Sequence, residues 1–322
     1  MGVYMGLDIG GTKCAAVAGA LEGENLRILA REAFATPRSQ EEAMDRLCAL
    51  AGGLAQGRQI LGVGISSGGP MDAERGMLCN PPNLPGWSGL SLTDYARARL
   101  HAPALLENDA NACALAEWLY GAGEKCRNMI FLTFGTGLGA GLILDGKLYE
   151  GTNGNAGEVG HIRLSENGPV GFGKFGSFEG FCSGGGIAQL GYTLGLAAYQ
   201  RGERPLYFNP DTAPKDITAK SVAIAAEQHG DPTAIEVYRL CGEYLGRGLS
   251  ILIDLLNPER IVIGSIFTRS RNGLWESCKE VIDREALEIS RNCCEVVPAK
   301  LLEGIGDYAA LTVGVYQNGK DL

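Results

Sequence analysis

Residues 6–13 read Gly-Leu-Asp-Ile-Gly-Gly-Thr-Lys, and this stretch decides the fold. It joins two short apolar runs, Val3–Asp8 and Cys14–Ala20, whose composition is typical of β-strands. A Gly-Gly turn between two such runs predicts a β-hairpin, because glycine adopts the backbone angles that tight turns need. The first strand ends in a carboxylate, Asp8, directly before the turn.

A weak internal repeat of this motif follows about one domain length further along the chain. Residues 132–137 read Leu-Thr-Phe-Gly-Thr-Gly, again an apolar run that ends in a glycine-rich turn. The repeat predicts two similar α/β domains, each with one glycine hairpin. We expect a small N-terminal domain of residues 1–108 and about 305–322, and a larger domain of residues 109–304.

The composition of the chain excludes several classes of protein. The chain has 322 residues, 48 of them glycine, and a net charge of −9 without a long basic run. That charge argues against nucleic acid or an anionic membrane as the main partner. No apolar stretch is long enough to span a membrane, and the N-terminus lacks a signal pattern, so we expect a cytoplasmic protein. The ten cysteines include no Cys-Xaa-Xaa-Cys, and we expect all ten to be small buried hydrophobes rather than disulfides.

Both glycine turns are candidates for binding phosphate. Gly135–Gly141 is a poor dinucleotide motif, since the residues that follow read as a strand rather than a helix. Neither turn has the Gly-Lys-Ser/Thr ending of a Walker A loop. Hairpin glycines let backbone N–H groups approach phosphate oxygens, although plain turns remain the alternative. Asp8 would then hold Mg²⁺ beside the phosphates, directly or through water, or else bond the N–H groups of its own turn.

A second motif, Glu-Asn-Asp-Ala-Asn at residues 107–111, precedes a helix-like run, Ala110–Tyr120. A carboxylate at the start of a helix, Asp109, can accept the proton of a bound alcohol. Asp and Asn are also common helix caps, so Asp109 has two interpretations, a catalytic base and a cap. With the two glycine turns, this motif suggests phosphoryl transfer to a hydroxyl.

A third motif is Glu158-Val159-Gly160-His161, in a glycine-rich region that we expect to be a loop from 151 to 186. Glu158 and His161 can hydrogen-bond adjacent hydroxyls of a polyol, and Glu179 lies in a similar stretch. A structural contact between Glu and His is the alternative interpretation.

Apolar periodicity predicts the remaining elements. The expected helices are Gln40–Leu54, Leu92–Leu100, Ser221–His229, Ala234–Leu256, Leu274–Glu288 and Tyr308–Tyr316. The expected strands are Ile60–Ser66, Ala104–Leu106, Met129–Phe134, Leu142–Leu144 and Arg260–Ile263.

Together these segments resemble the ROK family of bacterial sugar kinases and repressors, within the hexokinase–actin–Hsp70 superfamily. The resemblance runs from Gly6 to about Gly314. It rests on the motifs above and on Asn-Pro-Pro-Asn-Leu-Pro-Gly-Trp at residues 80–87. It implies two ribonuclease H-like α/β domains of the actin-like ATPase/hexokinase type, with an active-site cleft between them. A homodimer is a further expectation from the family.

The resemblance also implies roles for single residues. Asp109 would be the catalytic base that takes the proton from the sugar 6-hydroxyl. The expected hexose ligands are Gly69, Asn83, Asn108, Asp109, Glu158, His161 and Glu179. The expected contacts of ATP and Mg²⁺ are Asp8, Gly10, Gly11, Thr12, Lys13, Gly135, Thr136, Gly137 and Gly264. The family's adenosine turn usually has a second glycine, where this chain has Ser265.

One departure from the family concerns zinc. Family members usually carry three cysteines after the histidine that bind a structural zinc together with it. Those three positions hold Val170, Phe172 and Ser177. His161 alone cannot build a tetrahedral site, so we expect no zinc. The residues expected to replace the metal by apolar packing are Phe172, Phe175 and Phe178.

The sequence therefore predicts an ATP-dependent hexose kinase, and the segment Asn-Leu-Pro-Gly-Trp at 83–87 favours glucose by resemblance. N-acetylmannosamine, N-acetylglucosamine, mannose, fructose and allose remain open as substrates, and polyphosphate remains open as the donor. The alternative is a non-catalytic sugar sensor, against which the intact Asn108-Asp109 pair and both hairpins argue. Repressor members carry an N-terminal helix-turn-helix, whereas this sequence begins at the phosphate hairpin, which favours the enzyme.

Overall fold

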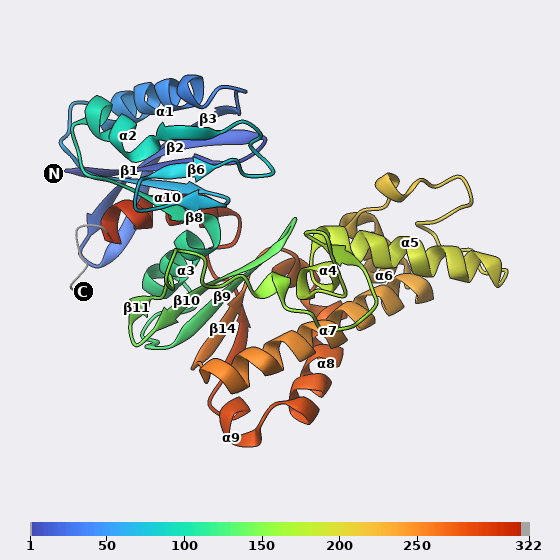
Figure 1. The fold of residues 1–322 in the computed structure, drawn as a ribbon. Coiled ribbons are helices and arrows are strands. Elements are labelled where there is room, and N and C mark those ends of the chain that lie inside the picture. Colours follow the sequence, from blue (N-terminus) through green and yellow to red (C-terminus); the bar gives the residue numbers. More distant parts are fainter. Residues whose placement is uncertain (1, 317–322) are drawn as a thin grey trace. The chain divides into compact units, whose positions relative to one another are not determined.

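The structure is a computed structural model that describes residues 2–316. The chain forms two compact units. Of the described residues, unit 1 comprises 2–127, 141–156 and 300–316, and unit 2 comprises 128–140 and 157–299. Each unit contains a sheet and several helices, and the boundary between the units runs through one strand, β10 (Leu138–Leu144) (Figure 1).

The helices and strands of unit 1 come from both ends of the chain. They are β1 (Val3–Ile9), β2 (Lys13–Glu22), β3 (Asn25–Ala35), α1 (Gln40–Ala55), β4 (Ile60–Ser67), β5 (Met71–Asp72), β6 (Met77–Cys79), β7 (Ser88–Ser91), α2 (Leu92–Leu100), β8 (Ala104–Asn108), α3 (Asp109–Tyr120), β11 (Lys147–Leu148) and α10 (Ile305–Tyr316).

Unit 2 contains fewer strands and longer helices. Its elements are β9 (Met129–Phe134), β12 (Val170–Gly171), β13 (Lys174–Phe175), α4 (Phe178–Phe181), α5 (Gly184–Gln200), α6 (Ala219–His229), α7 (Pro232–Leu256), β14 (Arg260–Ile263), α8 (Ile266–Glu285), α9 (Glu288–Arg291) and β15 (Glu295–Pro298). Three single 3-10 turns complete the two units, at Val159–His161, Pro214–Asp216 and Leu302–Gly304.

The two large sheets have the same strand order. The first is β3-β2-β1-β4-β8 and the second is β11-β10-β9-β14-β15. Counted from its own first strand, each sheet is therefore ordered 3-2-1-4-5. In the first sheet β1 and β2 are antiparallel, while β1, β4 and β8 are parallel. The repeated order confirms the prediction of two similar α/β units, and the hairpin predicted around Gly10 is present, with Ile9 opposite Cys14.

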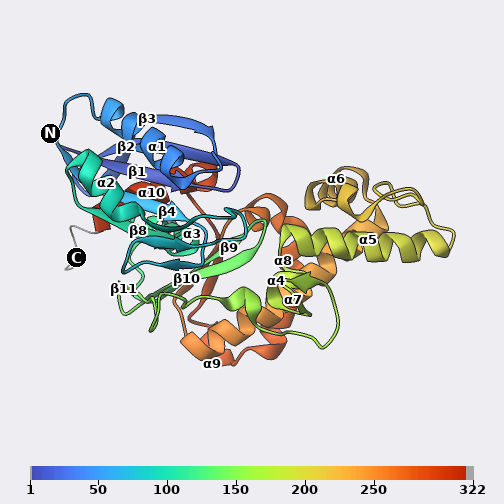
Figure 2. The same cartoon turned by 45° about the horizontal axis from the view of Figure 1, so that its top comes forward.

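Alternation along β1 sorts its side chains onto two faces of the sheet. Met5 and Leu7 belong to a core that includes residues of α1 and α2, and Tyr4 belongs to a second core with Leu311 of α10. Helices thus cover both faces of the first sheet, as Figure 2 shows for α1 and α10. Asp8 is separated from Tyr4 by an even number of positions in β1, so its side chain points to the same face of the sheet, the face that α10 covers.

The main helices of unit 2, α7 and α8, pack closely on each other. A Cβ atom at Gly246 would lie 2.5 Å from the Cys278 carbonyl oxygen, and one at Gly242 would overlap the Leu274 carbonyl. Glycine at these two positions of α7 is what allows the close approach. Within the described chain, no helix is both long enough and apolar enough to cross a membrane.

The structure differs from the sequence prediction at several elements. β3, α5 and β15 were not predicted, β10 and α8 begin earlier than expected, and α10 begins at Ile305 rather than Tyr308. All ten cysteines are free, but the predicted burial is wrong for Cys79 and Cys293, which are exposed.

The compact units and the predicted domains divide the chain at different residues. The prediction assigned residues 109–304 to the larger domain, whereas α3 lies in unit 1 because α10 packs against it. The predicted domain limits stay a prediction.

Candidate active site

The carboxylate of Asp8 lies beside the first turn of α10. α10 can approach β1 and β4 because glycine occupies the contact points. A Cβ atom at Gly6 would lie 2.8 Å from the Leu311 nitrogen, and one at Gly64 would overlap the Ala310 carbonyl. At Gly306 a Cβ atom would lie 3.5 Å from Asp8 Oδ2. The close packing of α10 therefore fixes the position of Asp8.

Negative charge is concentrated around Asp8. Burial, followed by repulsion from Asp307 and Asp109, raises the pKa of Asp8 to about 6, while Arg31 and Lys13 lower it. Arg31 Nε donates to both carboxylate oxygens of Asp307 at 2.8 Å. A cation beside Asp8 would relieve this repulsion, so the group of oxygens fits Mg²⁺.

Mg²⁺ in such a position would need ligands from outside the protein. In the part of the chain that the structure describes, no three His, Cys, Asp or Glu side chains lie close enough to hold a metal ion. Mg²⁺ usually keeps several waters and takes only one or two carboxylates beside substrate phosphates. Asp8 matches that pattern.

Asn108 and Asp109 both bond the first turn of α3. Asn108 is the N-cap of α3, and its Oδ1 accepts a hydrogen bond from the Ala110 N–H at 2.9 Å. Asp109 is the first helical residue, and its Oδ1 accepts from the same N–H at 2.8 Å. The Asp109 side chain is open to solvent, yet the protein atoms around it raise its pKa by desolvation. Asn108 is thus the N-cap, and Asp109 is an exposed residue that bonds the same N–H through Oδ1.

Parallel pairing brings Gly69 to the same place. β4 and β8 run side by side, with Ser67 opposite Asn108 at their carboxyl ends. A Cβ atom at Gly69 would lie 3.4 Å from Asn108 Nδ2. The sequence predicted no role for Glu107. This residue is buried, and its carboxylate accepts hydrogen bonds from Asn111 Nδ2 at 3.0 Å and from the Asn108 N–H at 2.8 Å. Its charge braces the turn that presents Asp109.

The first glycine turn packs against Asn83. A Cβ atom at Gly11 would lie 2.7 Å from the Asn83 carbonyl oxygen. The turn is closed by the Gly10 N–H, which donates to the Lys13 carbonyl at 3.0 Å, and Thr12 lies exposed between them. Unit 1 therefore gathers the predicted residues Asp8, Gly10–Lys13, Gly69, Asn83, Asn108 and Asp109 at the carboxyl ends of its parallel strands.

Unit 2 gathers the second group of predicted residues around the turn Gly135–Gly137. Glu179 Oε2 accepts from the Leu138 N–H at 3.0 Å, and a Cβ atom at Gly137 would lie 2.7 Å from that oxygen. At Gly160, between Glu158 and His161, a Cβ atom would lie 3.3 Å from Glu179 Cβ. Both Glu158 and His161 are exposed. Thr136 lies within the turn.

The turn after β14 lies beside the same glycines. The Gly264 N–H donates to the Leu132 carbonyl at 3.0 Å, and a Cβ atom at Gly135 would lie 3.6 Å from Ser265 Oγ. Ser265 has φ 56° and ψ −110°, a backbone conformation that glycine tolerates far better than serine. The predicted phosphate turn and adenosine turn are thus neighbours within unit 2.

Hydrogen bonds within the protein hold the loop at the family's zinc position. Ser177 is buried, accepts from the Gly180 N–H at 3.0 Å and donates to the Gly171 carbonyl at 3.4 Å. Phe178 is buried as expected, whereas Phe172 and Phe175 are 75% and 60% exposed, so the predicted apolar packing is wrong for Phe175, and among the described residues the ring of Phe172 pairs only with that of His161. Phe172 and Phe175 are exposed because the segment 170–175 forms a separate β-hairpin.

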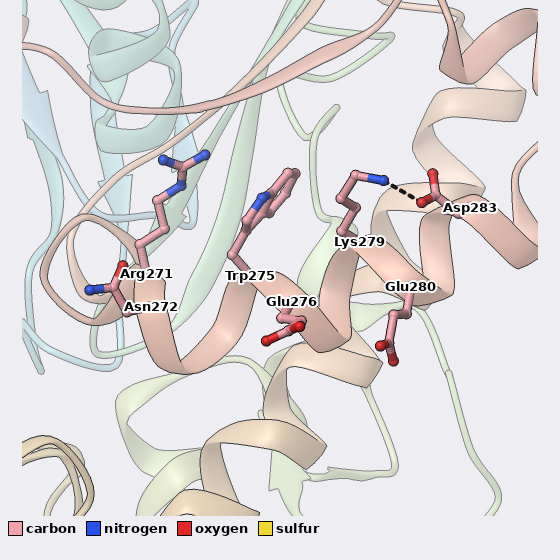
Figure 3. Close-up of a pocket in the computed structure, with 7 residues that line it drawn as sticks. All are labelled: Arg271, Asn272, Trp275, Glu276, Lys279, Glu280 and Asp283. Carbon is pink, nitrogen blue, oxygen red and sulfur yellow. Dashed lines mark hydrogen bonds and ion pairs between the residues drawn. The ribbon is translucent and has the colours of Figure 1, made fainter.

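A pocket of about 500 Å³ lies on α8, and none of the predicted site residues lines it. It is lined by Arg271, Asn272, Trp275, Glu276, Lys279, Glu280 and Asp283. The Arg271 guanidinium lies over the Trp275 ring, 5.2 Å from its centre, and Lys279 pairs with Asp283 (Figure 3). Charges of both signs already compensate each other here, so the pocket favours no particular ligand.

Comparison with known proteins identifies the family. The ROK family pattern matches residues 4–312. The chain belongs to the ROK family. It is 36% identical to a glucokinase from Streptomyces coelicolor over 82% of each chain. A crystal structure of a ROK family glucokinase from Streptomyces griseus in complex with glucose and AMPPNP superimposes with a TM-score of 0.77, at 31% identity, covering 98% of this chain and 100% of the other.

The family also contains regulators. The DNA-binding transcriptional dual regulator NagC of Escherichia coli is 29% identical over 85% of this chain and 67% of its own length. With these relatives, the predicted family and the predicted hexokinase-type fold are both confirmed.

The first prediction concerns zinc. Protein purified without added metal should contain far less than one zinc per chain, and EDTA should leave its thermal unfolding unchanged, because a structural site needs four ligands. The remaining thiol nearby, Cys182, is buried and bonds the Cys241 carbonyl at 3.5 Å instead. One zinc per chain by elemental analysis would contradict this expectation.

The second prediction concerns Asp8. A carboxyl group whose pKa is raised in the fold destabilises it above that pKa, and the effect disappears as pH falls toward 3.8. Without nucleotide and Mg²⁺, Asp8→Asn should therefore increase the free energy of unfolding by about 1–3 kcal/mol at pH 7.5 and leave it unchanged near pH 3.5. Urea unfolding at several pH values measures this. A pH-independent difference would show that the charge of Asp8 is not the cause.

The third prediction concerns Ser265. Replacing a non-glycine residue at φ 56° by glycine relieves backbone strain, so Ser265→Gly should stabilise the protein by about 0.5–2 kcal/mol. Ser290→Gly, in the short helix α9, is the matched control and should destabilise by about 0.5–1 kcal/mol. Chemical denaturation compares the two, and a loss of stability in both variants would contradict the strain argument.

Proposed function

We propose that this protein transfers the γ-phosphoryl group of ATP to the 6-hydroxyl of a hexose, with glucose as its substrate. The observation that carries the proposal is the exposed carboxylate of Asp109 at the start of α3. Asn108 is the N-cap of this helix, and desolvation by the surrounding protein atoms raises the pKa of Asp109, which suits a base.

The relatives support the class of reaction. The enzyme class, an ATP-dependent sugar kinase, is shown by the named glucokinases and by the kinase that was crystallised with an ATP analogue. The choice of glucose goes further and rests on the names of these relatives and on the segment at residues 83–87. The alternative is a sugar-binding regulator, and the likeness to regulators such as NagC supports it.

Asp109 would act on the attacking hydroxyl. Its carboxylate would accept the proton of the 6-hydroxyl as the oxygen attacks the γ-phosphorus in line with the leaving ADP oxygen. A base works best when its pKa lies near the working pH, so desolvation of Asp109 shifts it in the useful direction. The hydrogen bond from Ala110 keeps the carboxylate oriented while Oδ2 receives the proton.

The glycine turns would orient the phosphates. Their lack of side chains lets backbone N–H groups of Gly10–Lys13 and of Gly135–Gly137 approach phosphate oxygens, and Lys13 would add a positive charge. Asp8 would hold Mg²⁺, which when bound offsets the charge that develops on the phosphoryl group. Gly264 would lie against the adenosine, next to Gly135.

The hexose ligands would fix the other end of the substrate. In unit 1 they are Gly69, Asn83 and Asn108, and in unit 2 they are Glu158, His161 and Glu179. Glu179 is already oriented by the Leu138 N–H, which leaves its second oxygen to accept from a sugar hydroxyl. A homodimer and a cytoplasmic location are part of the same proposal, on family grounds alone.

The test of the function is ADP release with a panel of hexoses. Glucose should give the highest kcat/KM, and N-acetylglucosamine, N-acetylmannosamine, mannose, fructose and allose should give lower values. Polyphosphate in place of ATP tests the donor. Binding of a hexose without ADP release from any member of the panel would instead favour the sensor.

The fourth prediction concerns the base. Asp109→Asn keeps the volume of the side chain but cannot accept the proton, so kcat should fall by about 10²–10⁴ with little change in hexose binding. Asp94→Asn is the matched control, because Asp94 is also an acid in the first turn of a unit 1 helix. Turnover of the Asp109 variant within a few-fold of the wild type would reduce Asp109 to a structural residue.

A further inference from the structure

The segment Val170–Phe175 has no role in the proposed chemistry, although it replaces a conspicuous family motif. It forms a β-hairpin in which Val170 pairs with Phe175 and Gly171 with Lys174. The two turn residues, Phe172 and Gly173, have φ values of 42° and 74°. Such turns favour Asn, Asp and Gly, and a bulky aromatic residue at positive φ is rare. This unusual backbone conformation suggests that the ring of Phe172 has a specific role.

Two contacts connect this hairpin to His161. Lys174 Nζ donates a hydrogen bond to the His161 carbonyl oxygen at 2.7 Å. The ring of Phe172 meets the imidazole in a T-shaped arrangement, with 6.4 Å between ring centres and 76° between planes. This edge-to-face geometry is one that aromatic pairs prefer. The hairpin therefore contacts both the main chain and the ring of His161.

The base of the hairpin is fixed to the body of unit 2. The Gln189 side chain bonds Val170 twice, accepting from its N–H and donating to its carbonyl, both at 2.9 Å. Arg163 Nη1 donates to the Phe175 carbonyl at 2.7 Å, and Ser177 reaches Gly171. Because both strands are anchored, the position of the turn, and with it the Phe172 ring, is defined.

Phe175 is a second aromatic residue with which Phe172 can be compared. Phe172 and Phe175 lie on the same short hairpin and are both largely exposed, so neither contributes much to a core. Of these two rings, Phe172 alone forms an aromatic pair within the described residues, and its partner is His161. The contact with His161 therefore distinguishes Phe172 from an ordinary exposed aromatic residue.

We propose that Phe172 is a positioning residue that orients the imidazole of His161 toward the hexose, while Lys174 holds the main chain of His161. This rests on the proposed function, in which His161 is a hexose ligand. Phe172 acts through His161 and is not a catalytic residue. In this chain the hairpin would then orient the imidazole ring by packing and hydrogen bonding, where other family members would orient it through a bound metal.

Steady-state kinetics of Phe172→Ala and Phe175→Ala test the proposal. Loss of an aromatic pair should raise the KM for the hexose by about three- to ten-fold in Phe172→Ala, with kcat and the KM for ATP within two-fold of wild type. Phe172→Tyr should restore the KM, and Phe175→Ala should not change it. Equal effects of the two alanine variants, or a parallel rise in the KM for ATP, would overturn the proposal.

A second measurement reads the contact without any activity. The chain has only three histidines, His101, His161 and His229, so their ring protons are resolvable by NMR, and His161→Gln assigns the signal of interest. Phe172→Ala should shift the His161 ring signals, whereas Phe175→Ala should not. No shift in Phe172→Ala overturns the proposal even if the kinase activity is as expected.

The two measurements separate two failures. If the wild type phosphorylates no hexose but Phe172→Ala shifts the His161 signals, the proposed function fails and the contact stands. Hexose affinity by calorimetry then decides the positioning role, since Phe172→Ala should weaken binding three- to ten-fold. A shift in the His161 signals with unchanged hexose affinity would show a contact without a positioning role and would also overturn the proposal.

Discussion

The close packing of α10 on β1 and β4 is the constraint on which the rest of unit 1 depends. Glycine is needed at Gly6 and Gly64 for space rather than for backbone angles, since any side chain there would collide with the backbone of α10. At Gly314 the same holds in reverse, because a Cβ atom would lie 2.8 Å from the Gly64 nitrogen. Once α10 lies this close, alternation along β1 directs Asp8 to the first turn of α10. The Asp8 carboxylate thus lies in an electrostatically unfavourable position, near Asp307, as a consequence of backbone packing.

Unit 2 reaches a comparable result by a different interaction. There the Glu179 carboxylate accepts from the Leu138 N–H and so connects α4 to the glycine turn. Gly137 and Gly160 leave the space in which this carboxylate lies. This charged side chain therefore connects the proposed phosphate turn to a proposed hexose ligand, and the Gly184 N–H, which donates to the Gly135 carbonyl at 2.8 Å, adds a second bond to the same turn.

The sequence predicted those features that local chemistry determines. The Gly-Gly hairpin and the long periodic helices are of this kind. β3 was missed because charged residues such as Arg27, Arg31 and Glu32 interrupt its apolar residues irregularly, so it shows neither a long apolar run nor a strict alternation. α5 was missed because it begins with three glycines, which are poor helix formers, and it is started by the Ser183 cap. Which of residues 108 and 109 is the N-cap could not be predicted either, since Asn and Asp are both common caps and only the backbone shows where the helix starts.

The distinction between local chemistry and packing also explains which residues of the family's zinc motif can be replaced. At Gly176, with φ 62°, a side chain would overlap the Ser165 carbonyl, and at Gly171 a Cβ atom would lie 2.5 Å from the Gly180 nitrogen. The path of the loop is therefore determined by backbone contacts that only glycine permits. Of these two glycines, Gly176 belongs to the family motif, which the chain keeps at Gly173, Gly176 and Glu179. Thiolates at the zinc positions would add metal bonds to a loop whose backbone path is already determined. A buried serine that bonds two backbone groups can take the place of one of them, whereas no substitution at Gly171 or Gly176 would leave Glu179 where it is.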